Sequence, residues 1–328
     1  MHIFLLAARL RREMSLHLML VARRVKIWVE GYVYKTIVLR DASHADRFLS
    51  ALSFRPSSFA STRIKALCIC PRIPGPLAHR LLTLCTGIRS LALWLPAHAQ
   101  LGTPSGDPTT TATQSLLQLI SSLPLTSLST SIDLMSLLSA PTGTHAPGTV
   151  TASLNPHHLS SLNQAPANLT PPRAIFPTVA RLTHLDIVTH WALWTSSFGI
   201  EHLPHLTHLA FRSWARGDIS AALGKILGGS RSLEVLVLIV DGVVFASARG
   251  VYLEKNGVRD GRVVVMRREG EEWEMWGERE IEEKGGMWAC AEGVVQWRKE
   301  MGGRFPFLAG IFLNESHADR MEICSRSI

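Results

Sequence analysis

Two kinds of segment are missing from this chain of 328 residues, and each absence excludes a class of protein. No run of about 18 consecutive apolar residues is present, so the sequence contains no candidate transmembrane helix. The opening MHIFLLAARLRR has its apolar run before its charges, the reverse of a secretory signal. A mitochondrial presequence stays open as a minor alternative, because the arginines of this region are opposed only by Glu13.

Cysteine is scarce, and its spacing excludes both a disulfide framework and a structural zinc site. The five cysteines are odd in number and scattered: Cys68, Cys70, Cys85, Cys290 and Cys324. No C-x-x-C pair is present. Reduced thiols indicate an intracellular protein, in the cytoplasm or the nucleus, without a bound metal.

Recognisable catalytic motifs are also absent. The chain contains no G-x-x-x-x-G-K-[ST], no G-x-G-x-x-G, no H-E-x-x-H and no G-x-S-x-G. The sequence therefore predicts a protein that is not an enzyme and that uses no cofactor.

Negative charge is scarce in the first third of the chain. Lys and Arg against Asp and Glu give 15 − 4 = +11 for residues 1–100, 7 − 7 = 0 for 101–250 and 12 − 15 = −3 for 251–328. Such a basic region suits nucleic acid, an anionic membrane surface or an acidic protein, and the alternative is a merely solvated basic face. Nucleic acid is the least favoured partner, because no nucleic-acid-binding module accompanies the charge.

What the sequence does contain is a repeated apolar triplet at L-x-x-L-x-L spacing. The middle residues of the three clearest copies are Leu185, Leu209 and Leu236, at steps of 209 − 185 = 24 and 236 − 209 = 27. Further copies are centred on Leu67, Leu91 and Leu128, and a strand is expected at 262–266. The period predicts an α/β fold of the irregular leucine-rich-repeat-like solenoid type over residues 41–270, with flexible insertions at 101–114 and 139–174 and helical caps at both ends.

The N-terminal region 1–40 carries the most specific motif. Residues 15–29 place Leu18, Val21, Val25 and Trp28 on one face of an amphipathic helix, and a strand follows. The run LMLVARRVKIWVEGYVYKTIVL resembles the second half of an F-box, as found ahead of leucine-rich repeats in large fungal families of F-box-like proteins. The resemblance implies that these four side chains bind a Skp-type adaptor of a cullin ubiquitin ligase. The alternative is a cap that shields the first repeat.

Histidines mark the face of the predicted strands opposite the middle leucines. Alternation along a strand puts His184, Asp186 and Val188 on that face, with His208 and Arg212 on the next strand. His184 and His208 should lie side by side at the strand spacing of about 4.8 Å. We expect an exposed concave surface that binds a protein partner. A metal or acid–base site there is the weaker hypothesis, because two histidines alone rarely hold a metal.

The C-terminal region is rich in tryptophan and charge. Residues 271–304 predict a helical cap, in which Trp288, Ala291 and Val295 lie at helical spacing, and 305–328 form a tail without a clear period. Taken together, these features predict a non-enzymatic protein-interaction scaffold, in particular the substrate-recruiting subunit of a cullin-type ubiquitin ligase. The alternative is a basic protein that binds nucleic acid or a membrane surface.

Overall fold

The computed structural model describes residue 4 and residues 12–94, 115–116, 118–131, 179–190, 200, 203–213, 220–240, 260–267 and 287–301. The predicted insertions at 101–114 and 139–174, the cap residues 271–286 and the tail 305–328 lie outside this set.

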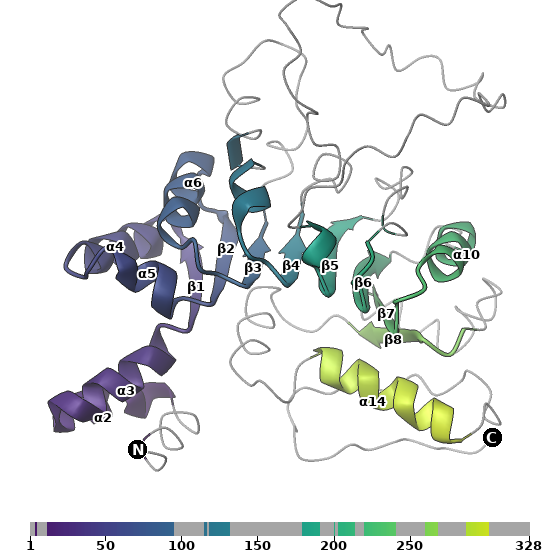
Figure 1. Ribbon diagram of the computed structural model, residues 1–328, viewed down its shortest axis with the longest axis horizontal. Helices are drawn as coiled ribbons and strands as arrows, with labels where there is room; N and C mark the ends of the chain where they lie inside the picture. The colour runs from purple at the N-terminus through teal and green to yellow at the C-terminus, as the bar shows by residue number, and fades with distance from the viewer. Residues whose placement is uncertain are drawn as a thin grey trace, which may run out of the picture.

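A single eight-stranded sheet forms the centre of the protein, and every pair of neighbouring strands is parallel. The strands lie in the sheet in the order in which they occur in the chain (Figure 1). They are β1 (Thr36–Asp41), β2 (Ala66–Arg72), β3 (Ser90–Leu93), β4 (Ser127–Thr130), β5 (His184–His190), β6 (His208–Ser213), β7 (Val235–Val240) and β8 (Val263–Arg267).

The register of the sheet follows the repeated triplets. A continuous row of leucines runs from β2 to β7, each opposite the next: Leu67, Leu91, Leu128, Leu185, Leu209 and Leu236. All six are buried, because their side chains share the face on which most helices pack. The predicted strands and their alignment are confirmed.

Helices on the first face supply the larger core. They are α4 (Ala42–Ser53), α5 (Ser58–Arg63), α6 (Gly75–Leu84) and α10 (Ser220–Gly229), with helical turns at 118–122 and a 3-10 turn, η1 (Val179–Arg181). Their apolar residues pack with the leucine row into one cluster that reaches from β1 to β8. Asp41 begins α4 as an N-cap, since its carboxylate accepts the backbone N–H of His44 at 2.9 Å.

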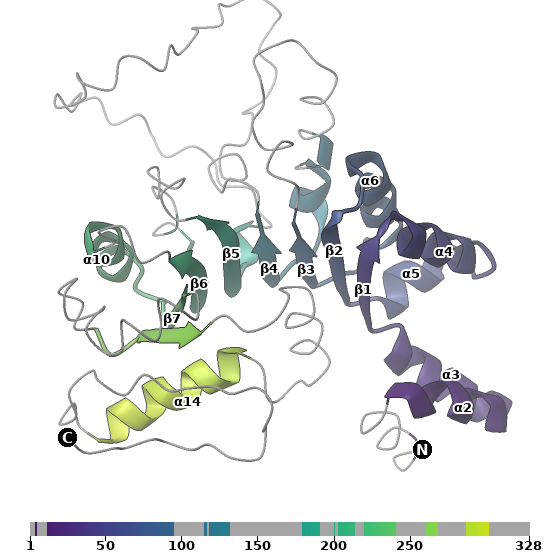
Figure 2. The ribbon, with the colours of Figure 1, turned by 180° about the vertical axis from the view of Figure 1, so that it is seen from behind.

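The second face carries a helix of its own near the C-terminal end of the sheet. The helix α14 (Met287–Glu300) packs on β6, β7 and β8 through Met287, Ala291, Val294 and Val295. Figure 1 shows α14 below β8, and the reverse view in Figure 2 also places it apart from α10. The sheet is therefore covered by helices on both faces over β6–β8.

This layered arrangement corrects the predicted leucine-rich-repeat-like solenoid. The structure is a Rossmann-like α/β arrangement with one open, all-parallel sheet, and the face expected to be an exposed concave surface is covered by α14 over β6–β8. The repeat period did not discriminate between the two folds. A step of 24–28 residues is the length of one strand, one helical connection and two turns, which an open parallel sheet also requires.

The N-terminal region forms a helical hairpin rather than one helix. The helices are α2 (Arg12–Val21) and α3 (Arg23–Val33), and Ala22 between them is extended, with φ −160° and ψ 152°. The hairpin lies to one side of the sheet in both views (Figures 1 and 2). The predicted single helix over 15–29 is therefore wrong. No helix among the described parts of the chain is both long enough and apolar enough to cross a membrane.

Candidate functional site

The four residues predicted to bind an adaptor do not share one exposed face. Val25 is buried between α2 and α3, and Leu18 and Trp28 are half-buried against the same small core. Val21 alone points into solvent, with 65% of its surface exposed. Three of the four side chains therefore contribute to the packing of the hairpin, and Val21 is the most exposed of the four.

Two neighbours of these residues are more exposed than the sequence pattern predicted. Leu20 is 84% exposed at the end of α2, and Ile27 is 49% exposed on α3. We call Leu20, Val21 and Ile27 the hairpin patch. The exposed side chains of Arg23, Arg24 and Lys26 lie in the same stretch of chain. Exposed apolar and cationic side chains thus alternate within residues 20–27.

This patch is not predictable from the sequence, because it depends on the helical break at Ala22. An uninterrupted helix would place Leu20 and Ile27 outside the stripe that begins at Leu18, so the pattern assigned them no role. Alanine is the most favourable helix residue, and nothing in the local sequence marks it as a boundary.

The hairpin is attached to the body of the protein at the end of α3. Glu30 forms an ion pair with Arg55, with 2.5 Å between Oε1 and Nη2. The Arg55 guanidinium also lies 5.3 Å from the centre of the Phe59 ring and 5.9 Å from that of Tyr34. These contacts fix the base of α3 and leave the other end of the hairpin, where the patch lies, away from the sheet.

The second predicted site lies on the face that α14 partly covers. The rings of His184 and His208 are stacked, with centroids 4.3 Å apart and an angle of 11° between their planes. The predicted adjacency of these histidines is confirmed. Trp288 of α14 meets both rings edge-on, at 5.5 Å from His184 and 5.4 Å from His208.

Hydrogen bonds orient each histidine ring. The Nδ1 atom of His184 lies 2.9 Å from the hydroxyl of Thr183, and that of His208 lies 2.8 Å from the hydroxyl of Thr207. On its other side, His208 Nε2 is 2.8 Å from Glu292 Oε1 of α14. Burial, together with the charge of His208, lowers the pKa of His184 to about 4. A neutral His184 is therefore the form that fits beneath α14 at neutral pH.

Asp186 is held within a short chain of buried polar side chains. The Trp94 indole N–H donates to Ser129 Oγ at 3.1 Å, and the Ser129 hydroxyl donates to Asp186 Oδ2 at 2.9 Å. Asp186 is only 5% exposed and Arg212 only 6%, while Val188 is half-buried. The predicted partner-binding residues thus do lie on one face, but most of them are closed off from solvent.

The arrangement does not form a metal centre. Within the ranges that the structure describes, no group of three or more His, Cys, Asp or Glu side chains is placed to hold a metal ion. His205 is exposed and separate from the stacked pair. The sequence also contains an H-x-x-H-x-x-H spacing formed by His202, His205 and His208, of which His202 lies outside those ranges.

The cysteines of the described ranges are free thiols: Cys68, Cys70, Cys85 and Cys290. Cys68 and Cys70 lie on the same face of β2, as alternation predicts, and both are buried. Burial raises the pKa of Cys85 to about 12 and also raises that of Cys68, with Cys70 contributing. These buried thiols are poor nucleophiles.

Comparison with known proteins adds no assignment: neither a protein-family model nor a curated protein matches the chain.

Proposed function

We propose that this chain is a non-enzymatic, intracellular protein-interaction scaffold that presents the α2–α3 hairpin to a partner protein. The observation that carries the proposal is the distribution of exposed apolar side chains. Of seven large hydrophobic residues exposed among the described ranges, four lie on the hairpin: Met14, Leu20, Val21 and Ile27. Exposed apolar residues that gather in one place mark an interaction site more often than scattered ones do.

The specific form of the proposal is a substrate-recruiting subunit of a cullin-type ubiquitin ligase. Its partner is then a Skp-type adaptor, which the N-terminal sequence motif implies. Within that motif, Val21 and its neighbour Leu20 are the contact residues in this proposal, because Val25 is buried inside the hairpin and Trp28 is half-buried there.

Binding of a purified Skp-type adaptor to the full chain tests this form. We expect Leu20→Asp with Val21→Asp to weaken the affinity at least about tenfold, because two buried apolar contacts would be replaced by solvated charges. Both residues are exposed, so the fold should tolerate the change. Phe54→Asp is the matched control, because Phe54 is 87% exposed at the end of α4 and lies outside the hairpin. Failure of the wild-type chain to bind the adaptor would refute the ligase form.

A second candidate function rests on the cations beside the patch. Arg23, Arg24 and Lys26 are all exposed, and they suit an anionic membrane surface or nucleic acid. This function predicts an affinity that falls steeply with salt and that is lost when all three are replaced by Gln. Replacement of Arg47, Arg72 and Arg80 by Gln is the control, because these exposed residues carry the same charge elsewhere. Equal effects of both triple changes would argue against a site on the hairpin.

A further inference from the structure

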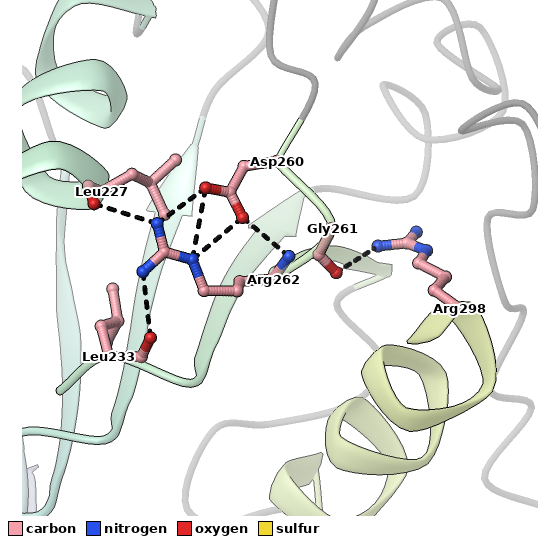
Figure 3. A network of polar contacts seen from close by, with 6 residues as sticks. All are labelled: Leu227, Leu233, Asp260, Gly261, Arg262 and Arg298. Carbon is pink, nitrogen blue, oxygen red and sulfur yellow. Dashed lines mark hydrogen bonds and ion pairs between the residues drawn. The ribbon is translucent and has the colours of Figure 1, made fainter. Parts of the chain in front are cut away.

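The helix α14 is attached to the sheet by a few contacts that differ in their chemistry. Its apolar side chains pack on β6–β8, and Glu292 meets His208 at 2.8 Å. Toward its end, the Arg298 guanidinium donates to the carbonyl oxygens of Val263 at 2.6 Å and Gly261 at 3.3 Å, the latter drawn in Figure 3. The Arg298 contacts involve no group that titrates near neutral pH. In contrast, the contacts at the start of α14 involve histidine rings.

The rings and charged groups around His184 determine whether a proton on its ring would be stabilised or destabilised. His208 of β6 stacks on it at 4.3 Å, and Trp288 of α14 contacts its edge. Among the described residues, the other charged groups on this side are Asp186 of β5, Arg212 of β6 and Glu292, which already contacts His208. Ser127, its register partner on β4, carries no charge. Asp186 Oδ2 is already hydrogen-bonded to Ser129, so its carboxylate is directed toward β4.

We propose that α14 is a pH-sensitive latch: its first half packs on the sheet only while the stacked His184 ring is neutral, and acidification releases it and uncovers the polar face of β5 and β6. The residues uncovered include His184 and His208, which α14 contacts through Trp288 and Glu292. This inference concerns the attachment of α14 and does not depend on which partner the protein binds.

Two effects favour release when His184 takes up a proton. The new cation would lie face to face with the His208 ring, and it would be partly buried beneath Trp288 of α14. Once α14 moves away, the His184 ring regains solvent, and its charged form is less penalised. Protons therefore bind more tightly to the released state than to the latched state.

The size of the effect follows from proton linkage. Burial and His208 lower the pKa of His184 to about 4 in the latched state, and this pKa rises toward its ordinary value of 6.5 as the ring regains solvent. Because the released state binds more protons, the ratio of released to latched molecules rises as the pH falls, by up to about 20-fold between pH 7 and pH 5. Most of the effect lies between the two pKa values.

Hydrogen–deuterium exchange of the full chain at pH 7 and pH 5, corrected for the intrinsic effect of pH on exchange, tests the latch. We expect protection of peptides from 287–300 to fall at pH 5, by up to about 20-fold from linkage. Protection of β2 and β3 should not change. In His184→Phe, which keeps a stacked ring but cannot titrate, the fall at α14 should disappear. His44→Phe is the control, because His44 is exposed on α4 and its loss should leave the fall intact.

Three results would overturn the proposal: unchanged α14 protection in the wild type at pH 5, a fall in His184→Phe as large as in the wild type, or an equal loss of protection in β2 and β3. The last would mean that acid unfolds the whole protein. If His184→Phe does not fold, a pH titration of the wild-type protein by NMR tests the latch instead. The His184 ring resonance and the α14 amide resonances should titrate with the same midpoint, and separate midpoints would refute the latch.

Discussion

Gly87 is a single residue whose missing side chain is structurally required. It follows α6, and a Cβ built on it would lie 1.7 Å from the backbone oxygen of Ser61. The atom it would meet belongs to the main chain, so it cannot move aside without shifting α5. We expect Gly87→Ala to lower the free energy of unfolding by about 1–3 kcal/mol, measured by urea denaturation.

Gly224 offers the matched control for that measurement. It lies inside α10, and a Cβ there would have nothing within 4 Å. Gly224→Ala should therefore stabilise the protein by about 0.5–1 kcal/mol, because alanine is the better helix residue. If both changes gave the same result, the close approach of the chain at Gly87 would not be the cause.

At the same scale, the stacked histidines show how far sequence reasoning reaches. Their adjacency follows from two neighbouring copies of T-H-L and the alternation of side chains in a strand, so the sequence was sufficient. Glu292 and Trp288, which complete the cluster, were not predictable. Glu292 is 84 residues from His208, and no local pattern indicates which face of the sheet a distant helix will cover.

Arg262 joins three elements at the C-terminal end of the fold, as Figure 3 shows. Its guanidinium pairs with the Asp260 carboxylate at 2.7–3.2 Å and donates to the carbonyl oxygens of Leu227 in α10 and Leu233 before β7. The Arg262 hydrogen bonds hold the pKa of Asp260 below its ordinary value. One side chain thus satisfies carbonyl groups at the end of a helix and in the turn that follows it.

We expect Arg262→Lys to behave as a disruptive change rather than a conservative one. An ammonium group cannot reproduce the planar fork that reaches Asp260, Leu227 and Leu233 at once. Stability should fall by about 1–3 kcal/mol, and hydrogen exchange at the end of α10 should accelerate. Arg231→Lys, at an exposed position nearby, should leave both quantities unchanged. Comparable losses in the two variants would show that the guanidinium network contributes little.

The N-terminal hairpin illustrates a failure of prediction at the level of an element. The spacing of Leu18, Val21, Val25 and Trp28 satisfies one helix over 15–29, and Ala22 has no tendency to interrupt it. The chain instead turns at Ala22 so that Val25 and Val29 can be buried between two helices. A lone amphipathic helix would leave that apolar stripe in water, so tertiary packing outweighs local propensity.

For the molecule as a whole, the continuity of the main core predicts a single unfolding transition. One cluster of buried side chains extends along the first face of the sheet and includes Leu67 of β2 and Leu236 of β7. Leu67→Ala and Leu236→Ala should each lower stability by about 2–5 kcal/mol. Each variant should still unfold in one step, with coincident tryptophan fluorescence and circular dichroism curves.

Separated transitions would contradict this expectation. If Leu67→Ala shifted only one of two phases, and Leu236→Ala only the other, the two ends of the sheet would be independent units. Such independence is typical of chains in which each unit contacts only its neighbours.

The strands could be predicted from the sequence, whereas the helix that covers the second face of the sheet could not. The leucine row fixed the position, direction and register of six strands, because each middle leucine must be buried on the same face. The second layer was missed because α14 closes the sheet through Met287, Ala291, Val294 and Val295, which are too few to indicate where the helix packs. Because the packing of α14 on the sheet was not predicted, the partner-binding face was expected to be exposed.

The sequential order of the strands has a consequence for how such a chain can vary. Since each strand lies beside its predecessor, no connection crosses another, and the length of a connection does not affect which strands pair. The two longest connections, between β3 and β4 and between β4 and β5, join strands that remain in register. A reporter domain inserted into either connection should therefore leave the sheet intact, so these connections are the places where we expect the chain to tolerate added segments.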